Sequence, residues 1–179
     1  MTRYVAFLRA INVGGHLVKM DDLKRSFEAL RFENVSTFIA SGNVMFESQA
    51  QAADLEPRIE EHLQQSLGYA VGTFLRSEDE VAQIARHEPF DSPATTYIML
   101  MRSKPDAATV ERVLALATEH EPVVVHGREA YFQPVSFLES LVSGGLGKIL
   151  GTECTMRNAN TLRRLAAKFT APPAQTSIG

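Results

Sequence analysis

Three short stretches of the chain contain the residues best suited to hold a ligand. The first, Arg9–Gly15, follows an apolar run and combines two adjacent glycines with polar side chains. The second is Ser41–Asn43, and the third is Thr155–Asn158. Glycine amides, side-chain amides and guanidinium groups all donate hydrogen bonds, and together they can hold a phosphate or a carboxylate. The chemistry that these stretches favour is anion binding.

The elements around the first two stretches predict a β-α-β-β-α-β order. Short apolar runs indicate strands, and apolar residues spaced three or four apart indicate amphipathic helices. Gly68 stands where a helix would end, and Ser77–Glu80 has the spacing of a capping box. The expected elements are strand 4–8, helix 21–31, strands 35–40 and 44–46 joined as a hairpin, helix 55–67, strand 71–75 and a short helix 77–86.

This order makes a geometric prediction about the candidate residues. A helix crossover makes the first two strands parallel, and the third strand returns between them. The loop after the first strand therefore lies at the same edge as the hairpin turn. We expect this edge to gather Arg9, Asn12, Gly14, Gly15 and Lys19 with Ser41, Gly42 and Asn43. A purely structural role, as a glycine turn beside a hairpin, is the alternative.

The pattern begins again after a proline-bounded linker. Tyr97–Arg102 repeats the character of Tyr4–Arg9, a helix is expected to open at Pro105, and a second hairpin is expected over 123–132. The fold class predicted is α+β, with two ferredoxin-like (βαββαβ-type) halves in a pseudo-duplicated chain. The expected divisions are a first half 1–76, a connecting helix and linker 77–93, a second half 94–170 and a flexible tail 171–179.

The third stretch leads into a terminal amphipathic helix that carries Leu162 and Leu165. Thr155 or Asn158 is expected to cap this helix, which would leave Arg157 free to grip an oxyanion. A cap combined with a salt bridge from Arg157 to an acidic neighbour is the alternative.

Composition narrows the classes of protein. A net charge of −3 disfavours a nucleic-acid partner that is held by a basic field. The lone Cys154 excludes an intramolecular disulfide and fits a reducing compartment. No signal-peptide pattern opens the chain, and no apolar run approaches the ~20 residues of a membrane helix. We expect a cytoplasmic protein with no membrane partner, and a homo-oligomer is left open.

Several other chemistries fit the sequence poorly. Gly144–Lys148 resembles a phosphate loop, but Val142 replaces its first glycine and Ile149 its magnesium-binding hydroxyl residue. The five histidines show no ligand spacing with Cys154, so neither a metal nor a cofactor is expected. Cys154 also has no recognisable base beside it. The sequence therefore gives no catalytic residue and no reaction type, and leaves open whether the protein is an enzyme.

RNA-recognition modules share the βαββαβ order and stack bases on the aromatic residues of one sheet face. Tyr4, Phe7 and Phe46 could serve in this way. The first strand, however, is apolar on both faces, which predicts that the second half or a partner subunit covers the sheet. An RNA-binding or protein-interaction module that uses a sheet face is the alternative to anion binding.

The three stretches together resemble the bacterial family catalogued as domain of unknown function 1697, over residues 3 to about 169. The resemblance implies paired ferredoxin-like halves and brings no established activity. The positions that match the family's motifs are Arg9, Asn12, Gly14, Gly15, Lys19, Ser41, Gly42, Asn43, Arg157, Asn158 and Thr161. The chain departs from the pattern at Ala10, where glycine is usual, at Ala159, where an aromatic residue is common, and at Cys154, where a small residue is typical. We expect the motif residues other than Thr161 to bind a small anionic metabolite or a nucleotide.

Overall fold

The computed structural model describes residues 1–12, 14–39, 42–136, 141–150 and 154–170; of residues 141–144 it describes the backbone alone. Ser41 and the predicted tail 171–179 lie outside the described residues. The elements in order are β1 (Thr2–Arg9), α1 (Met20–Ala29), β2 (Glu33–Phe38), β3 (Asn43–Ser48), α2 (Ala52–Leu67), β4 (Gly72–Ser77), α3 (Glu78–Arg86), β5 (Tyr97–Met101), α4 (Ala107–Leu114), β6 (Val123–His126), β7 (Glu129–Phe132), α5 (Leu141–Leu150), β8 (Cys154–Asn158) and α6 (Ala159–Thr170).

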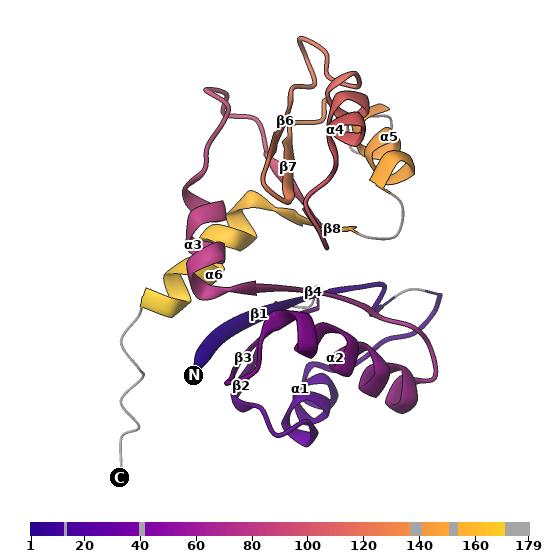
Figure 1. Ribbon diagram of the computed structural model, residues 1–179, viewed down its shortest axis with the longest axis vertical. Helices are drawn as coiled ribbons and strands as arrows, with labels where there is room; N and C mark the ends of the chain where they lie inside the picture. The colour runs from indigo at the N-terminus through magenta and orange to yellow at the C-terminus, as the bar shows by residue number, and fades with distance from the viewer. Residues whose placement is uncertain (13, 40–41, 137–140, 151–153, 171–179) are drawn as a thin grey trace.

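These elements form two four-stranded sheets with the same topology. The first has the strand order β2-β3-β1-β4 and the second β6-β7-β5-β8, and every neighbouring pair is antiparallel. Strands β1 and β2 thus run parallel with β3 between them, as predicted. The two ferredoxin-like halves are confirmed, and each ends in a further helix, α3 or α6. These two helices lie side by side between the sheets (Figure 1).

Several helix boundaries follow directly from their caps. Gly68 ends α2 at φ +83°, a left-handed conformation that glycine adopts without strain. Ser77 and Glu80 form the predicted capping box at the start of α3. Helix α4 begins at Ala107 and not at Pro105, because the Asp106 side chain accepts a hydrogen bond from the amide of Thr109 at 2.7 Å. Its last residue is Leu114.

The stretch Thr155–Asn158 forms a strand, and its prediction as a simple helix cap was incomplete. Cys154–Asn158 is β8, the edge strand that completes the second sheet beside β5. Asn158 still caps the following helix, since its side chain accepts a hydrogen bond from the amide of Asn160 at 2.8 Å. The stretch therefore fixes the last strand of the second sheet as well as the start of α6.

The apolar core has three layers, one within each half and one between the halves. Along β1 the side chains alternate, so that Tyr4, Ala6 and Leu8 pack under α1 and α2, whereas Val5 and Phe7 face the second half. That middle layer also contains residues of α3, α6 and the second sheet. The outer face of the second sheet packs against α4 and α5. The prediction that the second half covers the first sheet is confirmed. None of the helices in the described ranges is long and apolar enough to span a membrane.

The buried middle layer predicts a large cost for truncating a side chain within it. We expect Leu100→Ala to lower the free energy of unfolding by about 2–5 kcal/mol, because Leu100 is fully buried between the halves. Leu17→Ala, at a side chain that is 83% exposed, is the matched control and should change it by less than about 0.5 kcal/mol. Urea unfolding measures both. Equal, small effects would contradict a closed interface.

Candidate functional site

The end of β1 and the turn between β2 and β3 meet, as the topology predicts. The amide of Leu8 donates to the carbonyl of Gly42 at 2.8 Å. Gly42 has φ +71°, and a Cβ placed on it would lie 2.8 Å from the Ile11 Cγ2 atom. Only glycine fits this contact between the loop and the turn.

Asn43 and Arg157 lie at this junction in a buried hydrogen-bond network. Asn43 is fully buried, and its amide nitrogen donates to the carbonyl of Phe38 at 3.1 Å. The Arg157 side chain donates from Nε to the Asn43 Oδ1 atom at 2.7 Å and from one terminal nitrogen to the Leu8 carbonyl at 2.9 Å. Its other terminal nitrogen donates to Thr155 Oγ1 at 3.0 Å. Arg157 thus ties β8 of the second half to the first half.

This placement differs from the expectation that Arg157 stands free for an oxyanion. Arg157 is only 8% exposed, its donors point to protein acceptors, and its guanidinium lies 5.6 Å from the centre of the Phe7 ring. Burial lowers the pKa of Arg157 to about 10, since the charged form loses hydration. The acceptors that Asn43, Thr155 and Leu8 provide for Arg157 are neutral oxygens.

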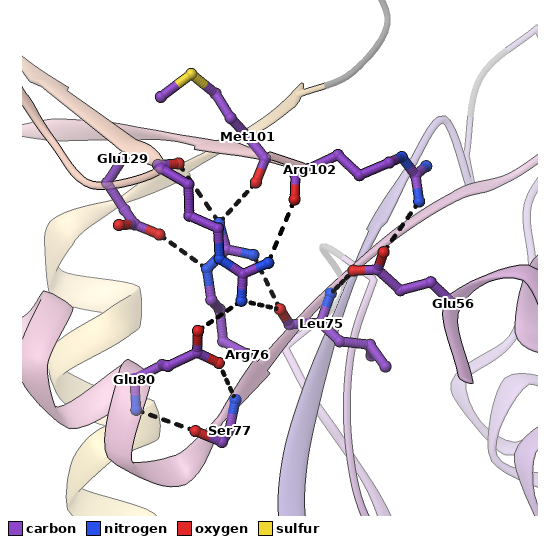
Figure 2. Close-up of polar contacts among 9 residues, drawn as sticks. Glu56, Leu75, Arg76, Ser77, Glu80, Met101, Arg102 and Glu129 are labelled. Atoms are coloured by element: carbon purple, nitrogen blue, oxygen red, sulfur yellow. Dashed lines mark hydrogen bonds and ion pairs between the residues drawn. The ribbon is translucent and has the colours of Figure 1, made fainter. Parts of the chain in front are cut away.

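A second arginine makes the reciprocal contact, and the sequence analysis did not single it out. Arg76 on β4 is fully buried; it donates to Glu129 Oε1 at 2.8 Å and to the carbonyl of Met101 at 2.8 Å (Figure 2). Burial lowers the pKa of Arg76, and the Glu129 carboxylate acts in the opposite direction. Arg76 thus ties the first half to the second as Arg157 does in reverse.

The strand registers show that these two contacts are equivalent. Arg76 pairs with Val5, and Arg157 pairs with Ile98. Their side-chain acceptors are equivalent too, because Asn43 pairs with Phe7 and Glu129 pairs with Leu100. The repetition of Tyr4–Arg9 in Tyr97–Arg102 is the sequence feature that could have revealed this. Each half therefore holds the other through the same strand position.

The outer edge of β4 is covered by charged side chains. Glu56 and Glu60 on α2 accept hydrogen bonds from the amides of Leu75 and Thr73 at 2.8 and 2.7 Å. Arg102, just after β5, donates to Glu56 at 3.2 Å and to Glu60 at 2.7 Å, and lies 5.0 Å from the centre of the Phe74 ring. Figure 2 shows Arg102 and Glu56 at this edge. These contacts hold Arg102 in one position.

Arg9 and Arg102 line one cavity of about 320 Å³, together with Ala10, Glu60, Gln64 and the chain at 70–72. The register makes Arg9 and Arg102 equivalent residues of the two halves, yet they meet at one place. Both are half-buried. The repeat of Tyr4–Arg9 in Tyr97–Arg102 includes Arg102, but the sequence predicted only Arg9 as a site residue.

The loop after Arg9 is anchored at both ends beside this cavity. Asn12 accepts a hydrogen bond from the amide of Val18 at 3.0 Å, which closes the loop. Tyr69, the neighbour of the cavity residue Ala70, donates to the carbonyl of Ile11 at 2.7 Å, and its ring stacks on His16 at 4.2 Å. Gly14, Gly15 and Lys19 are exposed on the loop. They therefore present donors to solvent.

The remaining candidates lie elsewhere. Asn158 lines a separate cavity of about 490 Å³ between the linker and the start of α6. Ser41 lies outside the described residues. The glycine-rich stretch Gly144–Lys148 is part of helix α5, and Cys154 is a buried residue of β8. The predicted set thus divides into a buried junction, an exposed loop with its cavity, and a distant cap.

The buried junction predicts that Arg157→Ala is strongly destabilising. We expect a loss of about 3–5 kcal/mol in the free energy of unfolding, because Asn43 and Leu8 would keep buried acceptors without their donor. Arg163→Ala on the same stretch of chain is the control, since its exposed ion pair with Glu88 contributes less than about 1 kcal/mol. Chemical denaturation measures both. A loss for Arg157→Ala no larger than that of the control would contradict the junction.

The backbone at Ala10 predicts a stabilising change. Ala10 has φ +64°, a conformation that costs an L-residue about 1–2 kcal/mol, and glycine is usual there in the family resembled. Ala10→Gly should raise the free energy of unfolding by about 0.5–1 kcal/mol after the extra entropy of glycine is subtracted. Ala82→Gly inside α3 should lower it by about 1 kcal/mol. Thermal unfolding would show shifts of opposite sign, and a loss at both positions would rule out strain at Ala10.

Comparison with known proteins agrees with this architecture. A solved structure of conserved bacterial protein SP0830 from Streptococcus pneumoniae matches with a TM-score of 0.77 and 22% identity, over 96% of this chain and 99% of that one. At this identity the likeness shows the fold alone. The comparison with curated proteins finds no match. The family described as protein of unknown function (DUF1697) matches residues 1–131, and the chain belongs to this family.

Proposed function

We propose that the protein binds a small anionic metabolite, one that carries a phosphate or a carboxylate group, in the cavity lined by Arg9 and Arg102. The proposal is based on one observation. Two half-buried arginines, one from each half, line a single cavity of about 320 Å³. Guanidinium groups bind the oxygens of phosphates and carboxylates through paired hydrogen bonds.

The charges around the cavity support an anion. Arg9, Arg102 and Glu60 line it, and Glu56, which is not part of the lining, also pairs with Arg102. Arg102 is already held by Glu56, Glu60 and the Phe74 ring, so little side-chain entropy is lost when a ligand binds. The volume is at the lower end for small-molecule sites, and it suits a compact metabolite better than a dinucleotide.

The loop 10–19 supplies further donors for a larger ligand such as a nucleotide. Gly14 and Gly15 have positive φ and exposed backbone, and Lys19 directly precedes α1. The strained conformation of Ala10, which lies on the cavity wall, is of the kind that collects at functional sites. A location in the cytoplasm belongs to the proposal, and it is supported by Cys154, a single buried cysteine that forms no disulfide within the chain.

Binding of RNA through a sheet face finds less support. In the described part of the chain both faces of each sheet are covered, by the other half or by helices. Phe7 lies beneath Arg157, and Tyr4 and Phe46 lie in the core under α1 and α2. No aromatic platform of this kind is open to a base.

Ligand-induced thermal stabilisation tests the proposal. The panel is inorganic phosphate, pyrophosphate, adenosine and guanosine monophosphates, and citrate, at low ionic strength. A ligand at 100 times its Kd stabilises by about 2.7 kcal/mol, which raises the Tm of a chain of this size by roughly 5–11 °C. Arg9→Gln should abolish most of this rise.

Arg112→Gln is the matched control, because Arg112 is exposed on α4, away from the cavity. It should keep the full response. A panel without any stabilising ligand, or a ligand that stabilises Arg9→Gln as much as the wild type, would refute binding at this cavity.

A further inference from the structure

A second cavity lies between α3 and the turn that joins β6 to β7. It measures about 240 Å³ and is lined by Glu80, Gln83 and Ile84 from the first half and by residues 126–129 and Tyr131 from the second. It shares no lining residue with the Arg9 cavity. The site is thus distinct from the one proposed above.

Tyr131 lines this cavity, and its buried hydroxyl group makes no hydrogen bond to any residue that the structure describes. Tyr131 itself is 1% exposed. Burial, reinforced by the Glu129 charge, raises the pKa of Tyr131, so the group stays a protonated donor. A buried donor without an acceptor destabilises the fold, and one that is retained calls for a partner.

Two histidine rings lie beside the Tyr131 ring. His126, which lines the cavity, stacks on His87 at 4.5 Å, and His87 meets the Tyr131 ring edge-on at 4.7 Å. One face of His126 is covered by His87, and His126 as a whole is exposed. A flat molecule can therefore extend this stack.

The charges around the cavity are already paired. Glu80 is bonded to Arg128 at 2.5 Å, and Glu129 is bonded to Arg76 at 2.8 Å. Glu80, Arg128 and Glu129 line the cavity, and the fully buried Arg76 behind it neutralises Glu129, so a charged ligand would meet a balanced set of charges. An uncharged ligand fits this balance best, one with an acceptor for Tyr131.

The volume limits the size of the ligand. A water molecule occupies about 30 Å³ of the liquid, so the cavity volume of about 240 Å³ corresponds to about eight water molecules. That is the size of a single six-membered ring with its substituents. We infer that this cavity binds an uncharged, planar, single-ring compound of the amide or pyrimidine-base type, with the Tyr131 hydroxyl donating to its carbonyl and the His126 ring stacking on it.

Ligand-observed NMR and titration of the full chain test this inference. The probes are uracil, cytosine and nicotinamide, with benzoate as a planar probe that carries a charge. At least one uncharged probe should bind wild-type protein. Tyr131→Phe should raise its Kd about five- to tenfold, through loss of one hydrogen bond. Tyr97→Phe, on the opposite face of the same sheet, should leave the Kd unchanged.

The thermal stability of the unliganded variant separates binding from folding. Because the hydroxyl has no protein partner, Tyr131→Phe should melt at or above the wild-type temperature. A lower melting temperature of Tyr131→Phe would show that the hydroxyl stabilises the unliganded protein, and it would overturn the inference. It would also be overturned if no uncharged probe binds, if benzoate binds as tightly, or if Tyr131→Phe binds as the wild type does.

Discussion

Two buried arginines that cross in opposite directions hold this fold together. Arg76 leaves the first sheet to reach the end of β5, and Arg157 leaves the second sheet to reach the end of β1. Each donates a hydrogen bond to a backbone carbonyl near the end of a strand in the other half. A buried guanidinium is expensive to desolvate, so each is tolerated only because its donors are satisfied by several acceptors. The apolar layer between the sheets and the packing of α3 on α6 depend on this alignment.

The two crossings are equivalent in position but different in charge. Arg157 meets the neutral amide of Asn43, whereas Arg76 meets the carboxylate of Glu129. Glu80 and Arg128 add a further ion pair on the Arg76 side. The halves have therefore kept a common geometry while their polar networks diverged. The polar cavity at Tyr131 lies on the charged side, and no described residue gives the Arg157 side a corresponding pair of carboxylates.

Much of the architecture followed from periodicity. The apolar residues on both faces of Tyr4–Leu8 predicted two covered faces, and the crossover rule predicted that the 9–15 loop lies beside the 41–43 turn. The predictions that were incomplete concern single short stretches and single side chains. Cys154–Asn158 mixes polar and apolar residues in so short a run that its identity as a strand depends on β5 alongside it. Arginine is normally exposed, so no pattern indicated that Arg76 and Arg157 would be buried. Asn158 was grouped with Arg157, although neighbouring strand residues point to opposite sides.

The reciprocal arginine contacts relate the two halves by an approximate two-fold symmetry. In a two-fold symmetric dimer the interface is isologous, so that if residue i of one subunit touches residue j of the other, j also touches i. Arg76 to Met101 and Arg157 to Leu8 obey this rule within one chain. The two halves thus meet as the subunits of a two-fold symmetric homodimer do, and the segment 87–96 joins them. Because both halves belong to one chain, a substitution in one half is not repeated in the other, and a cavity can differ on one side alone.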